Sequence, residues 1–200
     1  MVADLGRWEP LSVVDVVDLL ADAPFRWWIS GGRALALHLG ETWRPHEDTD
    51  VGVARSDAPA VHRHLRGWDL HVAAAGVLSP WDGRPLDPAA SENNVWVRRR
   101  PGEPWALDLT IGDGTDDEWV YRRDPSLRLP WGEAVLRTSD GVPYLAPELQ
   151  LLYKSRAVRP KDQADAERVI ACLEGPRCAW LAAALPADHP WQDLLAGGAQ

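Results

Sequence analysis

Cysteine is scarce in this sequence. Its 200 residues include two cysteines, Cys172 and Cys178, and both lie late in the chain. Two such residues form neither a disulfide framework nor a zinc-ligand pattern, so we expect small buried apolar side chains at these positions. A chain of this length can bury a stable core without covalent cross-links.

Long apolar runs are also missing. No apolar stretch approaches the ~18 residues that a membrane-spanning helix needs. The amino-terminal stretch MVADLGRWEP carries acids and lacks the basic and then apolar order of a signal peptide. We therefore expect a cytoplasmic protein with no membrane-spanning segment.

Lysine and net positive charge are the remaining deficits. The chain has two lysines, Lys154 and Lys161, against 19 arginines, and its formal net charge is -9. A non-specific nucleic-acid binder normally has a basic face. Nucleic acid is therefore not the expected partner, although residues 98–100 form a local run of arginines. An acidic surface suits a cationic partner better.

Apolar periodicity and turn residues predict mixed helices and strands over the first three-quarters of the chain. The predicted helices are 11–23, 33–40 and 58–67, and the predicted strands are 25–30, 49–54, 68–74, 94–100, 105–112 and 118–123. Residues 79–94 are predicted to form a loop. Ser139-Asp140-Gly141 predicts a hairpin turn between two further strands.

The character of the sequence changes at Pro147. Three amphipathic segments follow, opening on Pro147, Pro160 and Pro176, and proline is favoured in the first turn of a helix. The pattern predicts an α+β fold, with a small mixed sheet in residues 1–145 and a helical segment, residues 146–200, packing on it. The last five residues, AGGAQ, are expected to fray.

Two carboxylates, Asp48 and Asp50, stand on either side of Thr49. Alternate residues of a strand point to the same face. The two carboxylates would therefore repel and raise each other's pKa values unless a cation lies between them. A divalent metal is the usual cation at such a site. Taken alone, however, the pattern is better explained by two solvated acids at the start of an exposed strand.

A third carboxylate, Asp108, lies in the apolar strand WALDLTI. A carboxylate there is costly unless it is paired or bound to metal. If this strand lies beside that of Asp48 and Asp50, three carboxylates converge, which is enough for one or two Mg²⁺ ions. An ion pair with an arginine is the alternative explanation of Asp108 taken alone.

Ser30-Gly31-Gly32 follows a predicted strand and precedes a helix. Free backbone N–H groups and the positive end of a helix suit phosphate. The stretch is not a P-loop, because it lacks the Gly-Lys-Ser/Thr sequence. A plain tight turn is the alternative reading.

The order of these features resembles the nucleotidyltransferase superfamily related to DNA polymerase β. The residues that carry the likeness are SGGRALALHLG, RPHEDTDVGV and ALDLT. The resemblance is particularly to the small bacterial aminoglycoside and lincosamide nucleotidyltransferases. Two departures are an inserted Trp43 before Arg44, and Arg33 where the family often has an aromatic residue. The likeness covers about residues 25–112, and the C-terminal helices match more loosely.

This resemblance implies a mixed-sheet nucleotidyltransferase core and a set of site residues. Asp48, Asp50 and Asp108 would be the catalytic carboxylates and the ligands of Mg²⁺, and Asp108 would also take a proton from the acceptor hydroxyl. Ser30-Gly31-Gly32 would hold the triphosphate of the nucleotide.

Residues outside this core are weaker candidates. Arg44 is expected to contact phosphate or Asp48, and the resemblance places a lysine near the nucleotide in the region of Lys154. His46 either joins these contacts or only fixes its loop. Lys161 is explained well enough by an i,i+4 helix pair with Asp165.

The implied reaction moves a nucleotidyl group from a nucleoside triphosphate, with ATP expected, to a hydroxyl of a small molecule, and releases pyrophosphate. The resemblance points to an aminoglycoside-like antibiotic and to resistance, and the net charge points to a cationic acceptor. Two alternatives remain at this stage. One is a toxin–antitoxin-type nucleotidyltransferase that modifies tRNA or protein, and the other is a nucleotide-binding module without catalysis. The oligomeric state is not indicated.

Overall fold

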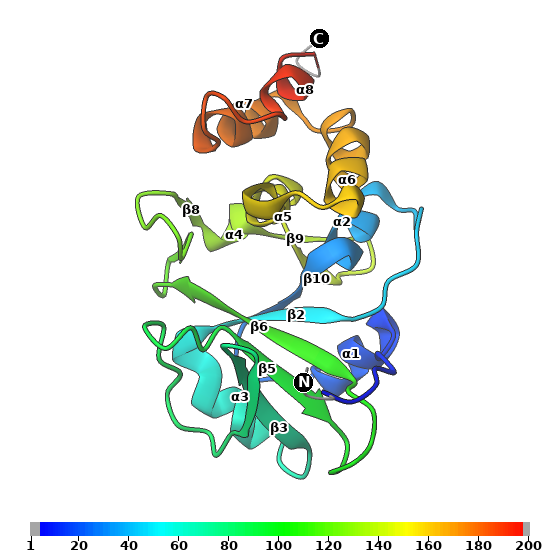
Figure 1. Ribbon diagram of the computed structural model, residues 1–200, viewed down its shortest axis with the longest axis vertical. Helices are drawn as coiled ribbons and strands as arrows, with labels where there is room; N and C mark the ends of the chain where they lie inside the picture. The colour runs from blue at the N-terminus through cyan, green and yellow to red at the C-terminus, as the bar shows by residue number, and fades with distance from the viewer. Residues whose placement is uncertain (1–4, 198–200) are drawn as a thin grey trace.

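The chain folds around one mixed β-sheet with helices on both faces, as the computed structural model in Figure 1 shows for the described residues 5–197. The strands are β1 (Trp27–Ile29), β2 (Asp50–Ala54), β3 (Asp69–Ala74), β4 (Val77–Pro80), β5 (Asn94–Arg98), β6 (Leu107–Gly114), β7 (Glu118–Val120), β8 (Arg128–Pro130), β9 (Val135–Arg137) and β10 (Pro143–Leu145). The helices are α1 (Val13–Leu19), α2 (Gly31–Leu39), α3 (Ala58–His64), α4 (Trp131–Ala134), α5 (Pro147–Lys154), α6 (Pro160–Ile170), α7 (Gly175–Ala184) and α8 (Gln192–Gly197). These elements confirm the predicted α+β fold.

The sheet has the strand order β4-β3-β5-β6-β2-β1-β10-β9, and β7 and β8 extend it from β6. Strand β2 pairs with β6 in parallel and with β1 antiparallel. The predicted hairpin around Ser139-Asp140-Gly141 is confirmed by the antiparallel pair β9–β10. The chain thus brings β1, β2 and β6, which carry the predicted site residues, together at the centre of the sheet.

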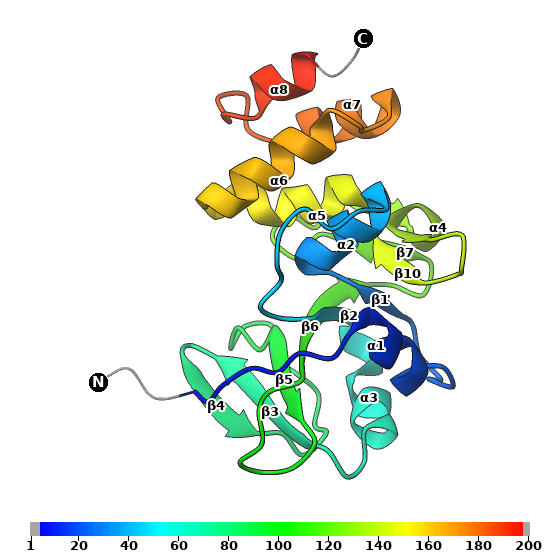
Figure 2. The same ribbon diagram turned by 90° about the vertical axis from the view of Figure 1, so that its right-hand side faces the viewer.

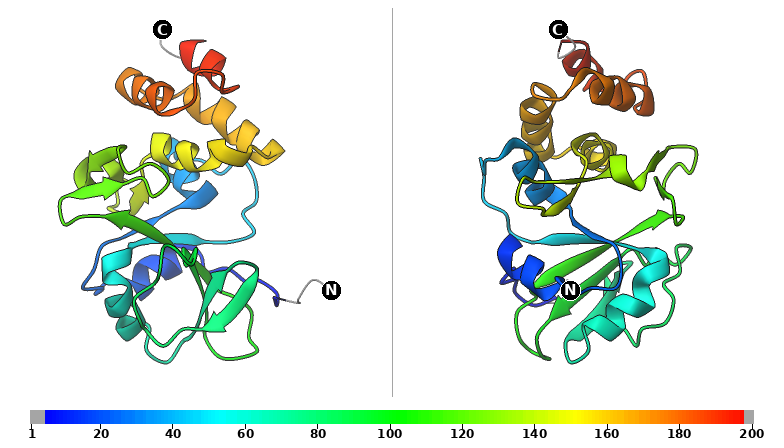
Figure 3. Two further views of the ribbon diagram at one scale, coloured as in Figure 1. Left: turned by 60° about the vertical axis from the view of Figure 1, so that its left-hand side comes forward. Right: turned by 180° about the vertical axis from the view of Figure 1, so that it is seen from behind.

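The two faces of the sheet differ in chemistry. Figure 3 shows α1 and α3 on the same side of β3, β5 and β6, where they bury Val51, Leu107 and Leu109 in one apolar core. Side chains alternate along a strand, so Asp50 and Asp108 point to the other face. Helices α5 and α6 lie above that face in both Figure 1 and Figure 2.

The C-terminal helices share a core with the first part of the chain. Helix α6 lies across α5 in Figure 2, and Figure 1 shows it next to α2. Leu149 of α5 and Ile170 of α6 belong to the same buried cluster as Trp28 of β1 and Leu35 of α2. The division into residues 1–145 and 146–200 stays a prediction, but the shared core holds α5 and α6 above the carboxylates.

Two predictions of local structure were wrong. Gly31 and Gly32 do not precede the helix but are its first two residues, with Ser30 as its N-cap. The predicted loop 79–94 contains the end of β4, which follows a turn at Ala75 and Gly76, both with positive φ. Alanine rarely adopts positive φ, so the Ala-Gly pair gave no hairpin signal of the kind Asn-Gly gives.

Further elements were not predicted, namely β8, α4 and α8. Each spans six residues or fewer, too short for a clear apolar period. Of the tail expected to fray, residues 196–197 belong to α8, and 198–200 lie outside the described residues. No helix within residues 5–197 is long and apolar enough to cross a membrane.

Candidate active site

The junction of β1 and α2 is fitted closely around Asp50. The backbone N–H of Ser30 donates to the backbone oxygen of Asp50 at 2.9 Å, and Gly31 has a φ of +67°. An ideal Cβ on Gly31 would lie 1.9 Å from Oδ2 of Asp50. The N–H of Gly31 donates to Oε1 of Gln150 on α5 at 2.8 Å. The Gly-Gly turn is therefore a close approach of backbone to a carboxylate, for which only glycine leaves room.

Replacing Gly31 with alanine is expected to destroy this geometry. The added methyl group would displace the Asp50 carboxylate, and the positive φ would add strain of about 1–3 kcal/mol. Displacing a positioned group by about 1 Å can cost roughly 100-fold in rate. Thermal unfolding and turnover measure the two effects. Gly175→Ala is the matched control, because nothing lies within 4 Å of its Cβ position. A Gly31→Ala variant as active as the control would contradict this geometry.

The register of β2 and β6 places two of the predicted carboxylates side by side. Asp50 is the parallel partner of Asp108, and neighbouring strands lie about 4.8 Å apart with their side chains on one face. Thr49 points the other way, is fully buried, and donates its hydroxyl to the backbone oxygen of Leu11 at 2.6 Å. Asp48 lies just before the strand and is exposed. The Asp-Thr-Asp pattern therefore anchors the strand through Thr49 and presents acids on the other side.

The protein offsets only part of the mutual repulsion of the two paired carboxylates. Burial raises the pKa of Asp50, and the carboxylates of Asp108 and Asp48 raise it further. Burial also raises the pKa of Asp108; the hydrogen bond from Asn94 partly offsets this, and Asp48 adds to it. Nδ2 of Asn94 donates to Oδ1 of Asp108 at 2.8 Å. Repulsion of this kind is relieved by a bound cation.

A divalent metal fits the chemistry of these donors. Carboxylate oxygens are the ligands that Mg²⁺ prefers. Asp50 and Asp108 are strand neighbours, and neither forms an ion pair among the described residues. Within residues 5–197, however, no group of three or more His, Cys, Asp or Glu side chains is arranged to hold a metal ion. The third carboxylate, Asp48, acts on both others electrostatically. The role of the three acids as metal ligands stays a prediction.

Arg44 and Lys154 converge on α6 through a buried ionic network. Arg44 donates through Nε and Nη2 to both carboxylate oxygens of Asp165, at 2.9 and 2.8 Å. Nζ of Lys154 lies 2.8 Å from Oδ1 of Asp162 and 3.1 Å from Oδ2 of Asp165. Both acids are essentially inaccessible to solvent. The network joins residues 41–48, α5 and α6, and sets where the two cations lie.

Two residues near Arg44 have structural contacts that the sequence did not reveal. Nε of Arg33 donates to the backbone oxygen of Asp48 at 3.0 Å, so Arg33 holds the acid-bearing segment in place. Burial, with help from the charge of Arg44, lowers the pKa of His46 to about 4, so its ring is neutral near pH 7. Arg44 and His46 both lie over Gly32, where a Cβ would approach Nη2 of Arg44 to 2.4 Å.

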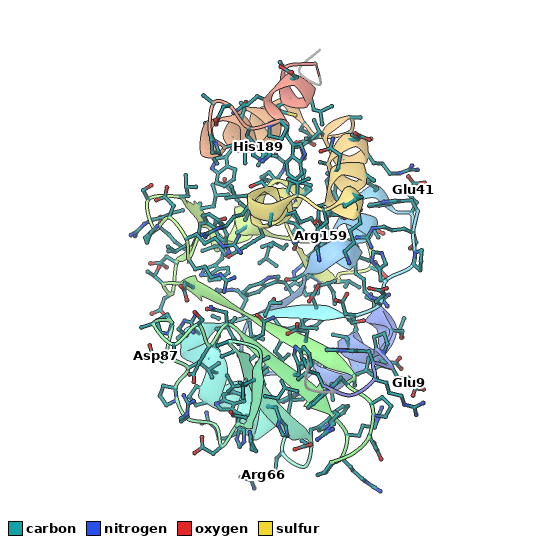
Figure 4. The ribbon with its side chains drawn as sticks, viewed as in Figure 1. Glu9, Glu41, Arg66, Asp87, Arg159 and His189 are labelled. Atoms are coloured by element: carbon teal, nitrogen blue, oxygen red, sulfur yellow. The ribbon has the colours of Figure 1, made fainter. Side chains whose placement is uncertain are left out.

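A cleft of about 790 Å³ opens between the start of α2, residues 44–48 and helices α5 and α6. Figure 4 labels Arg159 at the end of α6 that faces the sheet. The cleft gathers most of the predicted site residues and several others: Gly31, Gly32, Arg44, His46, Asp48, Asp50, Arg123, Gln150, Lys154, Arg156, Arg159, Lys161 and Asp162. Ser30 and Asp108 lie outside this lining, although Ser30 adjoins Gly31 and Asp108 pairs with Asp50.

Lys161 differs from its prediction. No ion pair between Lys161 and Asp165 is formed in the described part of the chain, because Asp165 is occupied by Arg44 and Lys154. Lys161 is exposed and lines the cleft instead. Its charge lowers the pKa of Asp50, although burial and the neighbouring acids outweigh it. Lys161 is thus a better candidate for contacting phosphate than it would be if it were paired with Asp165.

Sequence reasoning missed Gln150 and Asn94 as site residues. Gln150 stands between Leu149 and Leu151, both fully buried, and a polar residue within an apolar helix face was the signal available. Asn94 opens β5 directly after another asparagine, and only the register of β5 on β6 brings it to Asp108.

The comparisons with known proteins agree with this geometry. Residues 12–75 match a family model described as aminoglycoside-2''-adenylyltransferase. No curated protein matches the sequence. The lincomycin-bound lincosamide antibiotic adenylyltransferase LnuA is 18% identical, with 78% of this chain and 95% of that chain covered and a TM-score of 0.52.

Two further solved structures are similar. The antibiotic-resistance factor ANT(2'')-Ia, solved in solution, is 15% identical, with 92% of each chain covered and a TM-score of 0.56. A nucleotidyltransferase-like protein from Paracoccidioides brasiliensis is 19% identical, with 94% of this chain and 89% of that chain covered and a TM-score of 0.52.

Together the sheet, the Gly-Gly helix start and the paired carboxylates define a nucleotidyltransferase fold. The matched segment 12–75 adds a likeness in sequence, so this chain is similar in both fold and sequence to the antibiotic nucleotidyltransferases. The resemblance read from the sequence motifs is confirmed.

Proposed function

We propose that this protein transfers a nucleoside monophosphate from a nucleoside triphosphate, ATP in the first instance, to a hydroxyl of a small-molecule acceptor, and that Mg²⁺ is required. The observation that carries the proposal is the pairing of Asp50 with Asp108 beside the start of α2. Carboxylates for metal and backbone N–H groups for phosphate are then within one site.

The triphosphate is assigned to the large cleft. Its lining includes Gly31 and Gly32 at a helix start, together with Lys161, Arg156 and Arg159. A helix start and flexible cations suit phosphate oxygens. The N–H of Gly31 must exchange its bond to Gln150 for one to phosphate.

The reaction follows from the positions of the acids. The acceptor oxygen attacks the α-phosphorus, the bond from that phosphorus to the oxygen bridging to the β-phosphate breaks, and pyrophosphate leaves. Asp108 takes the proton of the attacking hydroxyl. Burial raises its pKa toward the neutral range, which suits a general base. The hydrogen bond from Nδ2 of Asn94 to Oδ1 holds the Asp108 carboxylate in position.

Asp48, Asp50 and Asp108 would hold the divalent metal. When bound, Mg²⁺ supplies neutralisation of the charge that develops on the phosphate oxygens. The acids would act on the α-phosphate through the ion that they hold, because carboxylates alone repel phosphate. Transfer of this kind depends on position and charge more than on covalent chemistry.

A screen for pyrophosphate release tests the proposal. The purified chain is incubated with Mg²⁺, each common nucleoside triphosphate, and a panel of hydroxylated antibiotics and metabolites. We expect acceptor-dependent release that falls by about 10³-fold in Asp108→Asn, since the lost base and metal ligand together contribute several kcal/mol. Equal release by Asp108→Asn, or binding of nucleotide without turnover on any acceptor, would overturn the proposal.

Macromolecular acceptors are not favoured. The matching family model and two of the similar structures are adenylyltransferases named for small antibiotics. Incubation with labelled nucleotide and total cell RNA or protein separates this alternative from the proposal. The expected result is that label enters neither macromolecule.

A further inference from the structure

A second and smaller pocket adjoins the large cleft at Gly31 and Asp50. It has a volume of about 210 Å³ and lies between the acid-bearing face of the sheet, β7 and α5. We call it the aromatic pocket, and its lining is Trp28, Ser30, Gly31, Asp50, Asn93, Asn94, Thr110, Ile111, Gly112, Trp119, Arg122, Arg123, Leu145, Gln150 and Tyr153. Because the two cavities meet at Asp50, molecules bound in each would meet at the carboxylates.

Three rings give the pocket its shape. Trp28 and Trp119 are almost fully buried, and Trp119 packs edge-on against Tyr153 with ring centroids 6.2 Å apart. Trp28 lies so close to Gly52 that a Cβ there would meet its ring nitrogen at 2.0 Å. Rigid aromatic walls of this kind favour a flat or ring-shaped occupant.

The polar end of the pocket is positively charged, in a chain whose net charge is -9. Nε of Arg122 is buried and has no hydrogen-bond partner within residues 5–197. Neither Arg122 nor Arg123 forms an ion pair in the described chain, and both guanidinium groups lie over the ring of Tyr153, at 5.9 and 5.6 Å. The nearby Asp113 is already bound to Arg55 at 2.7 Å.

The charges are separated along β6. Asp108, the partner of Asp50, is near the start of the strand, whereas Asp113 near its end pairs with Val120 of β7, two residues before Arg122. Five residues of strand span roughly 16 Å. An occupant thus meets the carboxylates at one end and, at the other, two guanidinium groups that form no ion pair in the described chain. A buried donor without a partner is costly, so Arg122 is poised for an anionic group.

We propose that the aromatic pocket binds the acceptor, and that this acceptor carries a ring and an anionic oxygen group, a carboxylate or phosphate, bound by Arg122. That the occupant is the acceptor rests on the proposed function, whereas the charge preference of the pocket does not depend on it. The proposal replaces the cationic acceptor expected from net charge alone, because the local charge decides what a small pocket binds.

Three phenols of similar size test the charge preference: 4-hydroxyphenylacetate, tyrosol and tyramine, which are anionic, neutral and cationic. Their binding to the full chain is measured by calorimetry without nucleotide. We expect the anion to bind at least about tenfold more tightly than the cation, as a charge-assisted hydrogen bond contributes. Equal or tighter binding of tyramine overturns the proposal.

Two variants assign the preference to this pocket. Arg122→Gln should remove it, whereas Arg128→Gln, an exposed arginine on β8 outside the pocket, should keep it. Asn93→Asp is a second probe that leaves Arg122 intact. In the parent chain Nη2 of Arg55 donates to Oδ1 of Asn93 at 2.8 Å, and the carboxylate introduced by the substitution can still accept this bond. This substitution should weaken binding of the anionic phenol and strengthen binding of the cationic one. If neither Arg122→Gln nor Asn93→Asp changes the preference, the proposal fails.

A competition experiment shows whether the phenol occupies the acceptor site or the nucleotide site. An ATP analogue with a methylene bridge between the α- and β-phosphates should leave binding of 4-hydroxyphenylacetate in place, since the two sites must be filled together. Displacement of the phenol by the analogue overturns the assignment to the acceptor. A retained charge preference without pyrophosphate release on any acceptor would refute the proposed function and still support the anionic pocket.

Discussion

Replacing Asp50 with asparagine is expected to abolish nucleotidyl transfer and, at the same time, to stabilise the metal-free protein. Transfer should fall by about 10³-fold or more, because a metal-binding carboxylate contributes several kcal/mol to the transition state. Stability should rise because Asp50 is buried beside two other acids that raise its pKa. Each 1 kcal/mol gained raises Tm by about 2–4 °C in a chain of this size. Calorimetric unfolding in chelator measures the gain.

The raised pKa of Asp50 also determines how the stability of the protein changes with pH. A carboxyl whose folded pKa is raised holds more protons in the folded than in the unfolded state. Its effect on stability is therefore absent below its ordinary pKa, near pH 4, and grows unfavourable as pH rises toward neutral. The difference in Tm between Asp50→Asn and the parent chain should widen over that range. Mg²⁺ should raise the Tm of the parent chain but not that of the variant.

The control for this result is Asp18→Asn, which removes an exposed acid from α1. It should change neither turnover nor the response to Mg²⁺. If Asp50→Asn lowers Tm in chelator, the carboxylate is stabilising the fold, and the view of Asp50 as an uncompensated charge is wrong.

Replacing Asp165 with asparagine is expected to destabilise the fold by about 3–5 kcal/mol, as the loss of one partner from a buried ion pair does. Asp165 is inaccessible to solvent and accepts bonds from Arg44, Lys154 and the ring nitrogen of Trp43. Its removal leaves the half-buried Arg44 without its carboxylate partner. Tm should fall on the order of 10 °C, and nucleotide binding should weaken because Arg44 then loses its place above Gly32.

Lowering the pH should reduce the difference in stability between the parent chain and Asp165→Asn. Burial alone would raise the pKa of Asp165, but the hydrogen bonds and charges of Arg44 and Lys154 outweigh it and hold the pKa below its usual range. The stability it contributes is present above its unfolded pKa, near pH 4, and is lost as pH falls through the lower folded value. The gap in stability between parent and Asp165→Asn should therefore narrow in strong acid.

Arg168→Gln is the matched control on the same helix. Arg168 pairs with Glu41 at 2.5 Å, but both side chains are about half exposed, at 46% and 52%. An exposed ion pair contributes about 0–1 kcal/mol. If Asp165→Asn costs no more than Arg168→Gln, the buried network does not hold α6 over the cleft.

Much of the core of this site could be predicted from local sequence. Asp108 was recognisable because a carboxylate inside an apolar strand is unfavourable unless it is paired or bound to metal. The predicted neighbourhood is confirmed, since β6 lies beside β2. The Gly-Gly pair was recognisable as a break between a strand and a helix, whereas its close approach to Asp50 was not predicted. Both signals come from residues whose neighbours in the chain make them conspicuous.

The remaining site residues depend on contacts between distant segments. Asp165 is one of three acids in α6, and only the fold brings Arg44 to it across more than a hundred residues. Arg122 belongs to an ordinary Arg-Arg pair, and its unpaired Nε becomes visible only when β7 and α5 enclose it. Composition is limited in the same way, because a net charge of -9 says nothing of the charge of one pocket.

The most direct test follows the phosphates of ATP. The chain is incubated with Mg²⁺ and an acceptor, using ATP labelled either at the α- or at the γ-phosphate. Nucleotidyl transfer predicts that α-label enters the acceptor, that γ-label appears in pyrophosphate, and that Asp50→Asn and Asp108→Asn stop both. Transfer of γ-label to the acceptor, or incorporation of α-label that survives both substitutions, would contradict the account.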